Sequence, residues 1–120
     1  MQTRIIVADF AGANNTEYYR SLEQKCADLD IAIVVANAGV MTVGEFDKIP
    51  ARVSQEMIDV NSYHYAMMQR IFLERLLERA DKGKRCALIG VSSCSWLRYF
   101  PRFAVYAATK AFASYLSMAM

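Results

Sequence analysis

The sequence has few cysteines, no cluster of basic residues and no long apolar run. Its 120 residues carry three cysteines and a formal net charge of +2. Cys26, Cys86 and Cys94 are odd in number and lack C-x-x-C spacing, which favours a reduced chain without a zinc or other metal site. The lysines and arginines are scattered rather than aligned in a stripe, so nucleic acid is not an expected partner.

Membrane and secretion signals are also lacking. No basic and then apolar leader precedes the first apolar run, which argues against a signal peptide. The longest apolar stretch, residues 31–44, carries Asn37 and glycines and falls short of the ~20 residues of a membrane span. We therefore expect an intracellular protein, cytoplasmic or associated with the endoplasmic reticulum membrane. Membrane association is expected only through segments outside these residues.

Strand-like and helix-like segments alternate along the chain. Near-solid apolar runs, typical of strands buried on both faces, occupy residues 4–8, 31–36 and 86–91. Helical patterns occupy residues 16–28, 51–80 and about 103–120. Asn14 or Asn15 is suited to cap the first helix, and Gly83 lies just past the end of the second. This alternation predicts βαβ units, and hence an α/β fold with a parallel sheet.

Chemistry-bearing residues lie on these elements in a fixed order. They are Asp9 at the end of the first strand, Asn37-Ala38-Gly39 after the second, Asn61 inside the long helix, and Ser93 thirteen residues before Tyr106 in Tyr106-Ala-Ala-Thr-Lys110. The order resembles that of the short-chain dehydrogenase/reductase family. The Asp-Phe after the first strand, the Phe-Pro before the tyrosine and the Ala-Phe after the lysine are most similar to hydroxysteroid and 3-ketoacyl-CoA reductases.

The residue types suit carbonyl reduction, which needs a hydride on carbon and a proton on oxygen. A free tyrosine has a pKa of about 10, and a nearby ammonium favours its phenolate form. Tyr106 and Lys110 stand at i and i+4 on one helix face, so both side chains are expected in one cleft. Ser93 leaves a strand at its carboxyl end, where open parallel sheets bind ligands, and its hydroxyl is placed to stabilise a substrate oxygen.

The resemblance implies further roles for these residues. It implies an NADP(H) or NAD(H) cofactor, with Tyr106 and Lys110 at the nicotinamide ribose and Asn37, Ala38 and Gly39 along the adenosine end. Asp9 would touch the adenine ring. Asn61 would sit at a local break of its helix and hold a water that links Lys110 to solvent. Asparagine competes for backbone hydrogen bonds inside helices, so a bend there is plausible on physical grounds as well.

One part of the family pattern is not in the sequence. The glycine-rich turn Thr-Gly-x-x-x-Gly-x-Gly, which would cradle the cofactor pyrophosphate, has no counterpart, and Gly12 is the only glycine in the first thirty residues. In a doubly wound sheet of strand order 3-2-1-4-5-6, the predicted strands would be the third, fourth and fifth, leaving a gap in the sheet. Residues 1–120 are therefore expected to form the central part of a single, longer Rossmann-type domain.

Two functions remain open from the sequence. One is an oxidoreductase acting on a lipid-like carbonyl or alcohol, such as a steroid or a 3-ketoacyl thioester. The other is a non-catalytic subunit that keeps the fold for packing in a larger assembly. In either case residues 51–80 and the C-terminal helix are expected to form a homo-oligomer face or a contact in such an assembly. A serine-hydrolase interpretation of Gly90-Val-Ser92-Ser-Cys94 is rejected, because a second glycine and a downstream histidine are absent.

Overall fold

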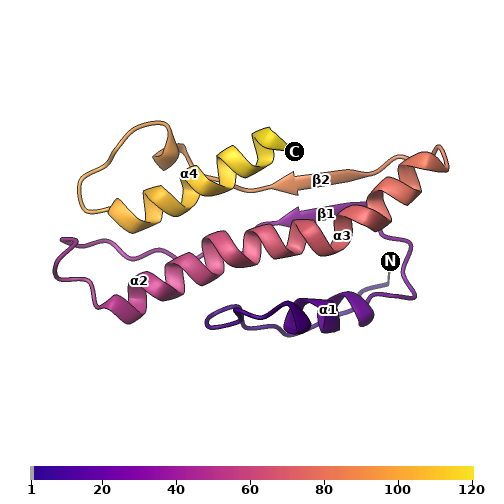
Figure 1. Cartoon of the computed structure of the whole chain (residues 1–120), viewed down its shortest axis with the longest axis horizontal. Coiled ribbons are helices and arrows are strands. Elements are labelled where there is room, and N and C mark those ends of the chain that lie inside the picture. Colours follow the sequence, from indigo (N-terminus) through magenta and orange to yellow (C-terminus); the bar gives the residue numbers. More distant parts are fainter. Residues whose placement is uncertain (1) are drawn as a thin grey trace.

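The computed structural model describes residues 2–120 and shows a two-stranded parallel sheet flanked by helices (Figure 1). The elements in chain order are α1 (Thr16–Gln24), β1 (Ile33–Ala36), α2 (Ala51–Ile58), the π-helical segment η1 (Asp59–Tyr63), α3 (His64–Asp81), β2 (Ala87–Gly90), the 3-10 turn η2 (Cys94–Trp96) and α4 (Ala104–Ala119). The molecule measures 50 × 27 × 27 Å, because α2, η1 and α3 run end to end along its length. The fold class is α/β, as the sequence predicted.

The two strands are parallel and lie in a single register. Val34 is paired with Leu88 and Ala36 with Gly90, and the Val91 N–H donates to the Ala36 carbonyl one step further on. Gly90 has no side chain for a packing reason. A Cβ there would lie 1.6 Å from the Tyr65 hydroxyl, which crosses over the strand. The strand therefore needs glycine at this point so that α3 can approach it closely.

Helices α3 and α4 cover one face of this sheet. Val34 packs against Phe72 and Leu76 of α3, and Ala36 packs with Tyr65 and Ala113. On the opposite face the strand side chains stay in solvent: Ile33 is 60% exposed, Val35 51% and Ile89 45%. These β-branched residues are of the kind found in strands buried on both faces.

The segment of residues 4–8, predicted as a strand separated from the others by a gap, pairs with neither β1 nor β2. This segment has no ladder hydrogen bonds, yet its side chains alternate as in a strand. Ile6 and Ala8 pack against the core beside α1, whereas Ile5 is 84% exposed and Val7 91% exposed. The alternation of buried and exposed side chains depends on the local backbone, whereas strand pairing needs a neighbouring strand. The gap expected between the predicted third and fourth strands leaves this segment without one.

The helices follow the sequence pattern with small adjustments. Asn15 caps α1 by accepting a hydrogen bond from the Tyr18 N–H, and α1 ends at Gln24 because residues 25–29 continue as tight turns. We call the end-to-end helices α2, η1 and α3 the rod. Gly83 lies just past its end with a φ of +70°, the left-handed conformation that favours glycine. The helix predicted over residues 51–80 is interrupted at residues 59–63, where η1 adds an extra residue to one turn.

The three cysteine thiols are free, so no disulfide links the elements described. No helix among residues 2–120 is both long enough and apolar enough to cross a membrane.

Candidate active site

The carboxyl ends of β1 and β2 place two loops at the same edge of the sheet. Because the strands are parallel and in register, the residues after Ala36 and those after Gly90 emerge side by side. The first loop holds Asn37, Ala38 and Gly39, and the second holds Ser92 and Ser93. Ligands of open parallel sheets bind at this edge, so the sequence-predicted residues reach the expected place.

Asn61 joins three parts of the site from inside η1. Its side chain is fully buried, and its amide pairs with the backbone of Val40, accepting from the Val40 N–H and donating to the Val40 carbonyl, both at 2.8 Å. The remaining Nδ2 proton is donated to the Thr109 hydroxyl at 3.0 Å. The Thr109 hydroxyl in turn donates to the Tyr106 carbonyl at 2.7 Å. We call this chain of hydrogen bonds, from Val40 through Asn61 and Thr109 to the Tyr106 carbonyl, the polar joint.

Lys110 is a buried cation on the inner side of α4. Its side chain crosses to the end of β2, where Nζ donates to the Val91 carbonyl at 3.3 Å. Only 5% of the residue is exposed, and burial lowers the pKa of its ammonium. Within residues 2–120 no carboxylate forms a salt bridge with it. An ammonium has three donors, so Lys110 keeps hydrogen-bonding capacity for a ligand.

Gly39 allows the first loop to lie against this lysine. A Cβ at Gly39 would lie 3.3 Å from Asn61 Oδ1 and 3.4 Å from Lys110 Nζ. These distances are tighter than most real Cβ contacts, so a side chain here would displace one of the two groups. Gly39, Asn61 and Lys110 therefore meet at one point of the site.

Tyr106 stands one turn before Lys110 and is half-buried. Lys110 Nζ lies 5.8 Å from the centre of the Tyr106 ring, and the Phe103 ring packs against the tyrosine at 6.3 Å between centroids. Among the described residues, the Tyr106 hydroxyl has no hydrogen-bond partner. The tyrosine and the lysine thus share one face of α4, as their spacing predicted.

Ser93 caps the turn η2 instead of contacting the pair. Its Oγ accepts hydrogen bonds from the Ser95 N–H at 3.2 Å and from the Ser95 hydroxyl at 3.1 Å. No hydrogen bond joins it to Tyr106 or Lys110 within residues 2–120. Both of its hydrogen bonds use acceptor sites, so its own proton remains available as a donor.

The family profile of short chain dehydrogenases matches residues 2–120. The chain belongs to the short-chain dehydrogenase family. Solved structures agree in fold: a short-chain dehydrogenase from Streptomyces avermitilis superposes with a TM-score of 0.81 at 24% identity, covering 95% of this chain and 40% of that one. The 3-ketoacyl-(acyl-carrier-protein) reductase of Brucella melitensis, solved with NADH, gives a TM-score of 0.80 at 23% identity, covering 93% of this chain and 46% of that one.

Curated relatives of this short-chain dehydrogenase carry lipid-related names. Hydroxysteroid dehydrogenase-like protein 1 of Gallus gallus is 30% identical, with all of this chain aligned to 35% of that protein. The Homo sapiens protein that is 30% identical over the same share is named an inactive hydroxysteroid dehydrogenase-like protein 1. The very-long-chain 3-oxoacyl-CoA reductase of Homo sapiens is 29% identical, with 38% of it covered. The chain thus spans little more than a third of these relatives' length.

The remaining predicted residues are Asn37, Ala38 and Asp9, and among residues 2–120 no hydrogen bond joins their side chains to Tyr106 or Lys110. Asn37 is exposed and Ala38 is half-buried in the loop after β1. Asp9 follows the extended segment of residues 4–8, and its Oδ1 accepts a hydrogen bond from the Ala11 N–H at 3.0 Å. That contact is a local turn, which leaves the second carboxylate oxygen of Asp9 open to solvent or a ligand.

Sequence reasoning missed the hydroxyl groups that hold α4 in place. The sequence assigned no role to Thr109, and Ser92 came into view only in the rejected serine-hydrolase motif. In the structure Ser92 Oγ donates to the Lys110 carbonyl at 2.8 Å and shares a hydrogen bond with Ser114. The inner face of α4 thus carries the buried hydroxyls of Thr109 and Ser114 beside the buried Ala113, and the Ser117 hydroxyl shares a hydrogen bond with that of Tyr65. A helix with hydroxyls on one side and Phe112, Tyr115 and Met118 on the other was the available signal.

Proposed function

We propose that this chain forms the central, catalytic part of an NAD(P)(H)-dependent oxidoreductase that transfers a hydride between the nicotinamide cofactor and a carbonyl or alcohol substrate. The observation that carries the proposal is the meeting of Gly39, Asn61 and Lys110 beside Tyr106. Lys110 is buried, has no carboxylate partner among residues 2–120, and lies against Gly39. The Tyr106 hydroxyl, one turn away, has no hydrogen-bond partner among the same residues. Both groups can therefore donate hydrogen bonds to a ligand.

Tyr106 and Lys110 would divide the proton chemistry between them. When a carbonyl is reduced, the Tyr106 hydroxyl gives its proton to the substrate oxygen, and in the reverse direction it takes that proton back. The Lys110 ammonium stabilises the phenolate left behind, more strongly in a buried site than in water. Ser93, with its proton free to donate, would hold the substrate oxygen and stabilise the charge that develops on it.

The residues present fit one end of a nicotinamide dinucleotide. Lys110 has donors to spare for ribose hydroxyls, and Gly39 admits a ligand close to Nζ. Asn37, Ala38 and Asp9 would follow the adenosine end. When bound, the nicotinamide supplies or accepts the hydride. No residues of this sequence match the glycine-rich cradle of the pyrophosphate, so that part of the site would have to come from other residues.

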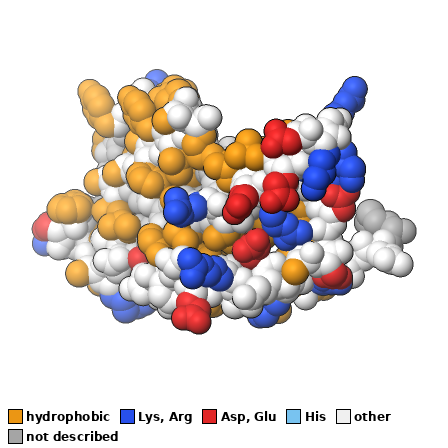
Figure 2. Space-filling model, turned by 45° about the vertical axis from the view of Figure 1, so that its right-hand side comes forward, with side chains coloured by type: hydrophobic (Ala, Val, Ile, Leu, Met, Phe, Trp, Pro, Cys, Tyr) orange, Lys and Arg blue, Asp and Glu red, His pale blue; other side chains and the backbone are white. Residues whose placement is uncertain are grey.

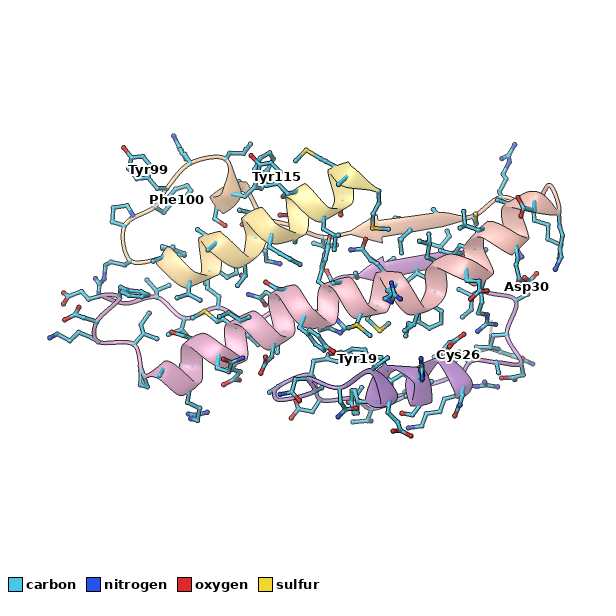
Figure 3. All side chains as sticks on the ribbon, in the orientation of Figure 1. Tyr19, Cys26, Asp30, Tyr99, Phe100 and Tyr115 are labelled. Carbon is cyan, nitrogen blue, oxygen red and sulfur yellow. The ribbon has the colours of Figure 1, made fainter. Side chains whose placement is uncertain are left out.

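The substrate class we propose is a lipid-like ketone or alcohol, such as a steroid or a 3-ketoacyl thioester. The names of the relatives support it, and so does the loop between Ser93 and Tyr106. In this loop Leu97 is 67% exposed and Tyr99 is 93% exposed, and Figure 3 shows Tyr99 beside Phe100. Figure 2 shows hydrophobic side chains gathered over this end of the surface, while charged side chains crowd the other. An apolar rim next to the reacting pair suits an apolar substrate.

Cofactor titration of the chain tests the proposal. Energy transfer from Trp96, the single tryptophan, to bound NADPH or NADH would report binding. Lys110→Met should weaken that binding, whereas Lys84→Met, which removes an exposed lysine at the far end of the rod, should not. Tyr106→Phe should abolish turnover and spare binding. Absence of binding by either nucleotide at millimolar concentration would exclude the enzymatic function for this chain.

A second candidate is a non-catalytic subunit of the same fold. The relatives named inactive favour it. Against it, this chain keeps Ser93, Asn61, Tyr106 and Lys110. A chain that binds no nucleotide but forms a stable, stoichiometric complex with another polypeptide would support this candidate over the first.

We also propose that the rod of α2, η1 and α3 and the helix α4 together form an oligomer face. Helix α4 turns its apolar side outward: Phe112 is 44% exposed, Tyr115 66% and Met118 62%. Figure 3 shows Tyr115 on the side of α4 that faces away from α3. Beside this face lies a hollow of about 410 Å³ between α2 and α4, lined mainly by apolar side chains that include Phe46, Ile58 and Val105. Light scattering should show a dimer or larger species that Tyr115→Lys dissociates, whereas Arg20→Glu, an exposed control on α1 outside the proposed face, leaves it intact.

The three free thiols support an intracellular location for this function. Fractionation of cells that express the tagged protein would test it, and recovery from the medium would contradict it.

A further inference from the structure

The polar joint uses each of its side-chain hydrogen-bonding groups. Asn61 Oδ1 accepts from the Val40 N–H, and the two Nδ2 protons go to the Val40 carbonyl and to Thr109 Oγ1. The Thr109 hydroxyl has one proton, and it is donated to the Tyr106 carbonyl. Since an amide turned end for end would set its NH₂ group against the Val40 N–H, the orientation of Asn61 is fixed.

Thr109 contributes the only side chain of the joint that belongs to the turn of the reacting pair. Its residue is 4% exposed, and it lies between Tyr106 and Lys110 in sequence. Its hydroxyl donates to the carbonyl at the start of that turn, that of Tyr106. A threonine inside a helix holds few rotamers, and a bond to the carbonyl three residues earlier selects one of them. The hydroxyl therefore stands at a fixed position, where it receives the Asn61 amide.

From this geometry we infer that Thr109 is a positioning residue, whose hydroxyl sets the turn from Tyr106 to Lys110 against Asn61 and the loop at Gly39 and Val40. The geometric part stands on the hydrogen bonds alone, and its catalytic consequence rests on the proposed function. Without the hydroxyl, one Asn61 proton loses its acceptor in a buried place, and η1 is free to shift relative to α4. Gly39 and Lys110 are then no longer held at a fixed separation, because their neighbours Val40 and Thr109 are joined through the Asn61 amide.

Three variants separate this role from general packing. Thr109→Val keeps the shape of the side chain and removes the hydroxyl, and Thr109→Ser restores the hydroxyl without the methyl group. Ser92→Ala is the matched control: it also removes a hydroxyl bonded to an α4 carbonyl, that of Lys110, but one that does not touch Asn61.

The readout is the Asn61 side-chain amide in ¹⁵N-labelled protein. In the unchanged chain both Nδ2 protons should be protected from exchange. In Thr109→Val one of them should shift upfield and exchange about tenfold faster or more, since it loses its acceptor. Thr109→Ser should return it to its original position. Ser92→Ala should lower the melting temperature and leave the Asn61 signals unchanged.

Two results would overturn the inference. The first is a Thr109→Val spectrum with both Asn61 protons unmoved, and the second is an equal disturbance in Ser92→Ala. If Thr109→Val does not fold, the unchanged chain still decides, because rapid exchange of one Asn61 proton there would show that Thr109 does not hold it.

Activity provides the second readout once cofactor turnover is measured. Thr109→Val should lower kcat by about tenfold with little change in KM, and Thr109→Ser should restore it, as expected for a group that aligns the reacting pair without binding substrate. A loss confined to KM, or one that serine does not restore, would contradict a positioning role. If the unchanged chain binds no cofactor, the proposed function fails, while the Asn61 spectra still test Thr109.

Discussion

The segments η1 and α3 contribute to two buried regions that are held together by different kinds of interaction. On the side of α4 lies the polar joint, where the Asn61 amide bonds Val40 and Thr109 and the Thr109 hydroxyl bonds the Tyr106 carbonyl. On the side of α1 lies what we call the aromatic cluster, formed by the rings of Phe10, Tyr18, Tyr19, Tyr63 and His64. The ring centroids of Phe10 and His64 are 3.5 Å apart, and Figure 3 shows Tyr19 between α1 and α3.

Buried polar atoms distinguish the two regions. Tyr19 Oη, His64 Nδ1 and Gln69 Nε2 are buried without a hydrogen-bond partner in the described chain. Burial also raises the pKa of the Tyr19 hydroxyl and lowers that of His64 to about 4, so both groups are held neutral. The aromatic cluster is therefore held by ring contacts that tolerate small shifts, and the polar joint by directional bonds that do not.

The placement of the two regions follows from what each must hold. The polar joint ties together loops at the carboxyl edge of the sheet, where displacements of an ångström matter for chemistry. The aromatic cluster packs the unpaired segment of residues 4–8 and the helix α1 onto α3. Among residues 2–120 this segment has no strand partner, so apolar contacts rather than ladder hydrogen bonds hold it against α1 and α3.

The largest expected effect is the loss of Asn61. Asn61→Leu keeps the volume but leaves the Val40 N–H and carbonyl and the Thr109 hydroxyl without their partner, and should cost about 3–5 kcal/mol in unfolding free energy. His64→Phe, three residues further along the chain, removes both ring nitrogens, of which Nδ1 is buried without a hydrogen-bond partner in the described chain, and should change stability by less than about 1 kcal/mol at neutral pH. Urea unfolding of both variants makes the comparison. Equal losses would show that the two regions do not differ as described.

The next effect is a dependence of stability on pH that arises in the aromatic cluster. The folded chain holds the pKa of His64 near 4, below its ordinary 6.5, because burial penalises the charged ring. The unfolded chain therefore binds the proton first, so stability is full above pH 6.5 and falls as the pH drops toward 4, by up to about 3 kcal/mol.

Urea midpoints between pH 7 and pH 4 measure this effect. His64→Phe should flatten the curve in this range, whereas the carboxylates that titrate below it should behave as before. A His64→Phe chain that loses stability as steeply as the unchanged one would remove histidine as the cause.

Local signals explain what the sequence predicted well. The end of the rod at Gly83, the cap at Asn15 and the break around Asn61 depend on residues a turn or less apart, and the structure shows all three. The shared face of Tyr106 and Lys110 follows from helical spacing alone.

Features that depend on tertiary neighbours were not predictable in the same way. The run at residues 4–8 has the composition and alternation of a strand, but pairing is decided by chain that must lie beside it. The hydroxyls along one side of the C-terminal helix are a sequence signal for Thr109, but an unspecific one, since such residues are equally common in turns and on solvated faces. Ser93 was placed at the correct strand end, but the bonds it makes to Ser95 depend on how the following turn closes.

A smaller effect is expected at the cap of α1, which supports the aromatic cluster from outside. Asn15→Ala removes the acceptor of the Tyr18 N–H and should cost about 1 kcal/mol. Asn15→Asp, which caps equally well, is the control. Because Tyr18 and Tyr19 enter the cluster from this first turn, hydrogen exchange should quicken in α1 and remain unchanged in α4. Faster exchange in both helices would mean that the two regions unfold as one unit.

The smallest expected effect concerns the ion pair that ties the unpaired segment to the chain after α1. The Arg4 guanidinium binds both oxygens of Asp28 at 2.6 and 2.7 Å and holds the pKa of that carboxyl at about 2, against an ordinary 3.8. A depressed carboxyl pKa contributes stability above pH 3.8 that is lost as the pH falls through 2. Both side chains are exposed, so the contribution is screened by water and salt, and Arg4→Gln should leave the unfolding midpoint in 0.5 M salt where it was.

Carbon NMR of the Asp28 carboxyl should nevertheless show its pKa move up toward the ordinary value in Arg4→Gln, and Arg4→Lys should keep part of the shift. An Asp28 pKa that stays low in Arg4→Gln would mean that the segment of residues 4–8 is held by its apolar contacts to the cluster alone.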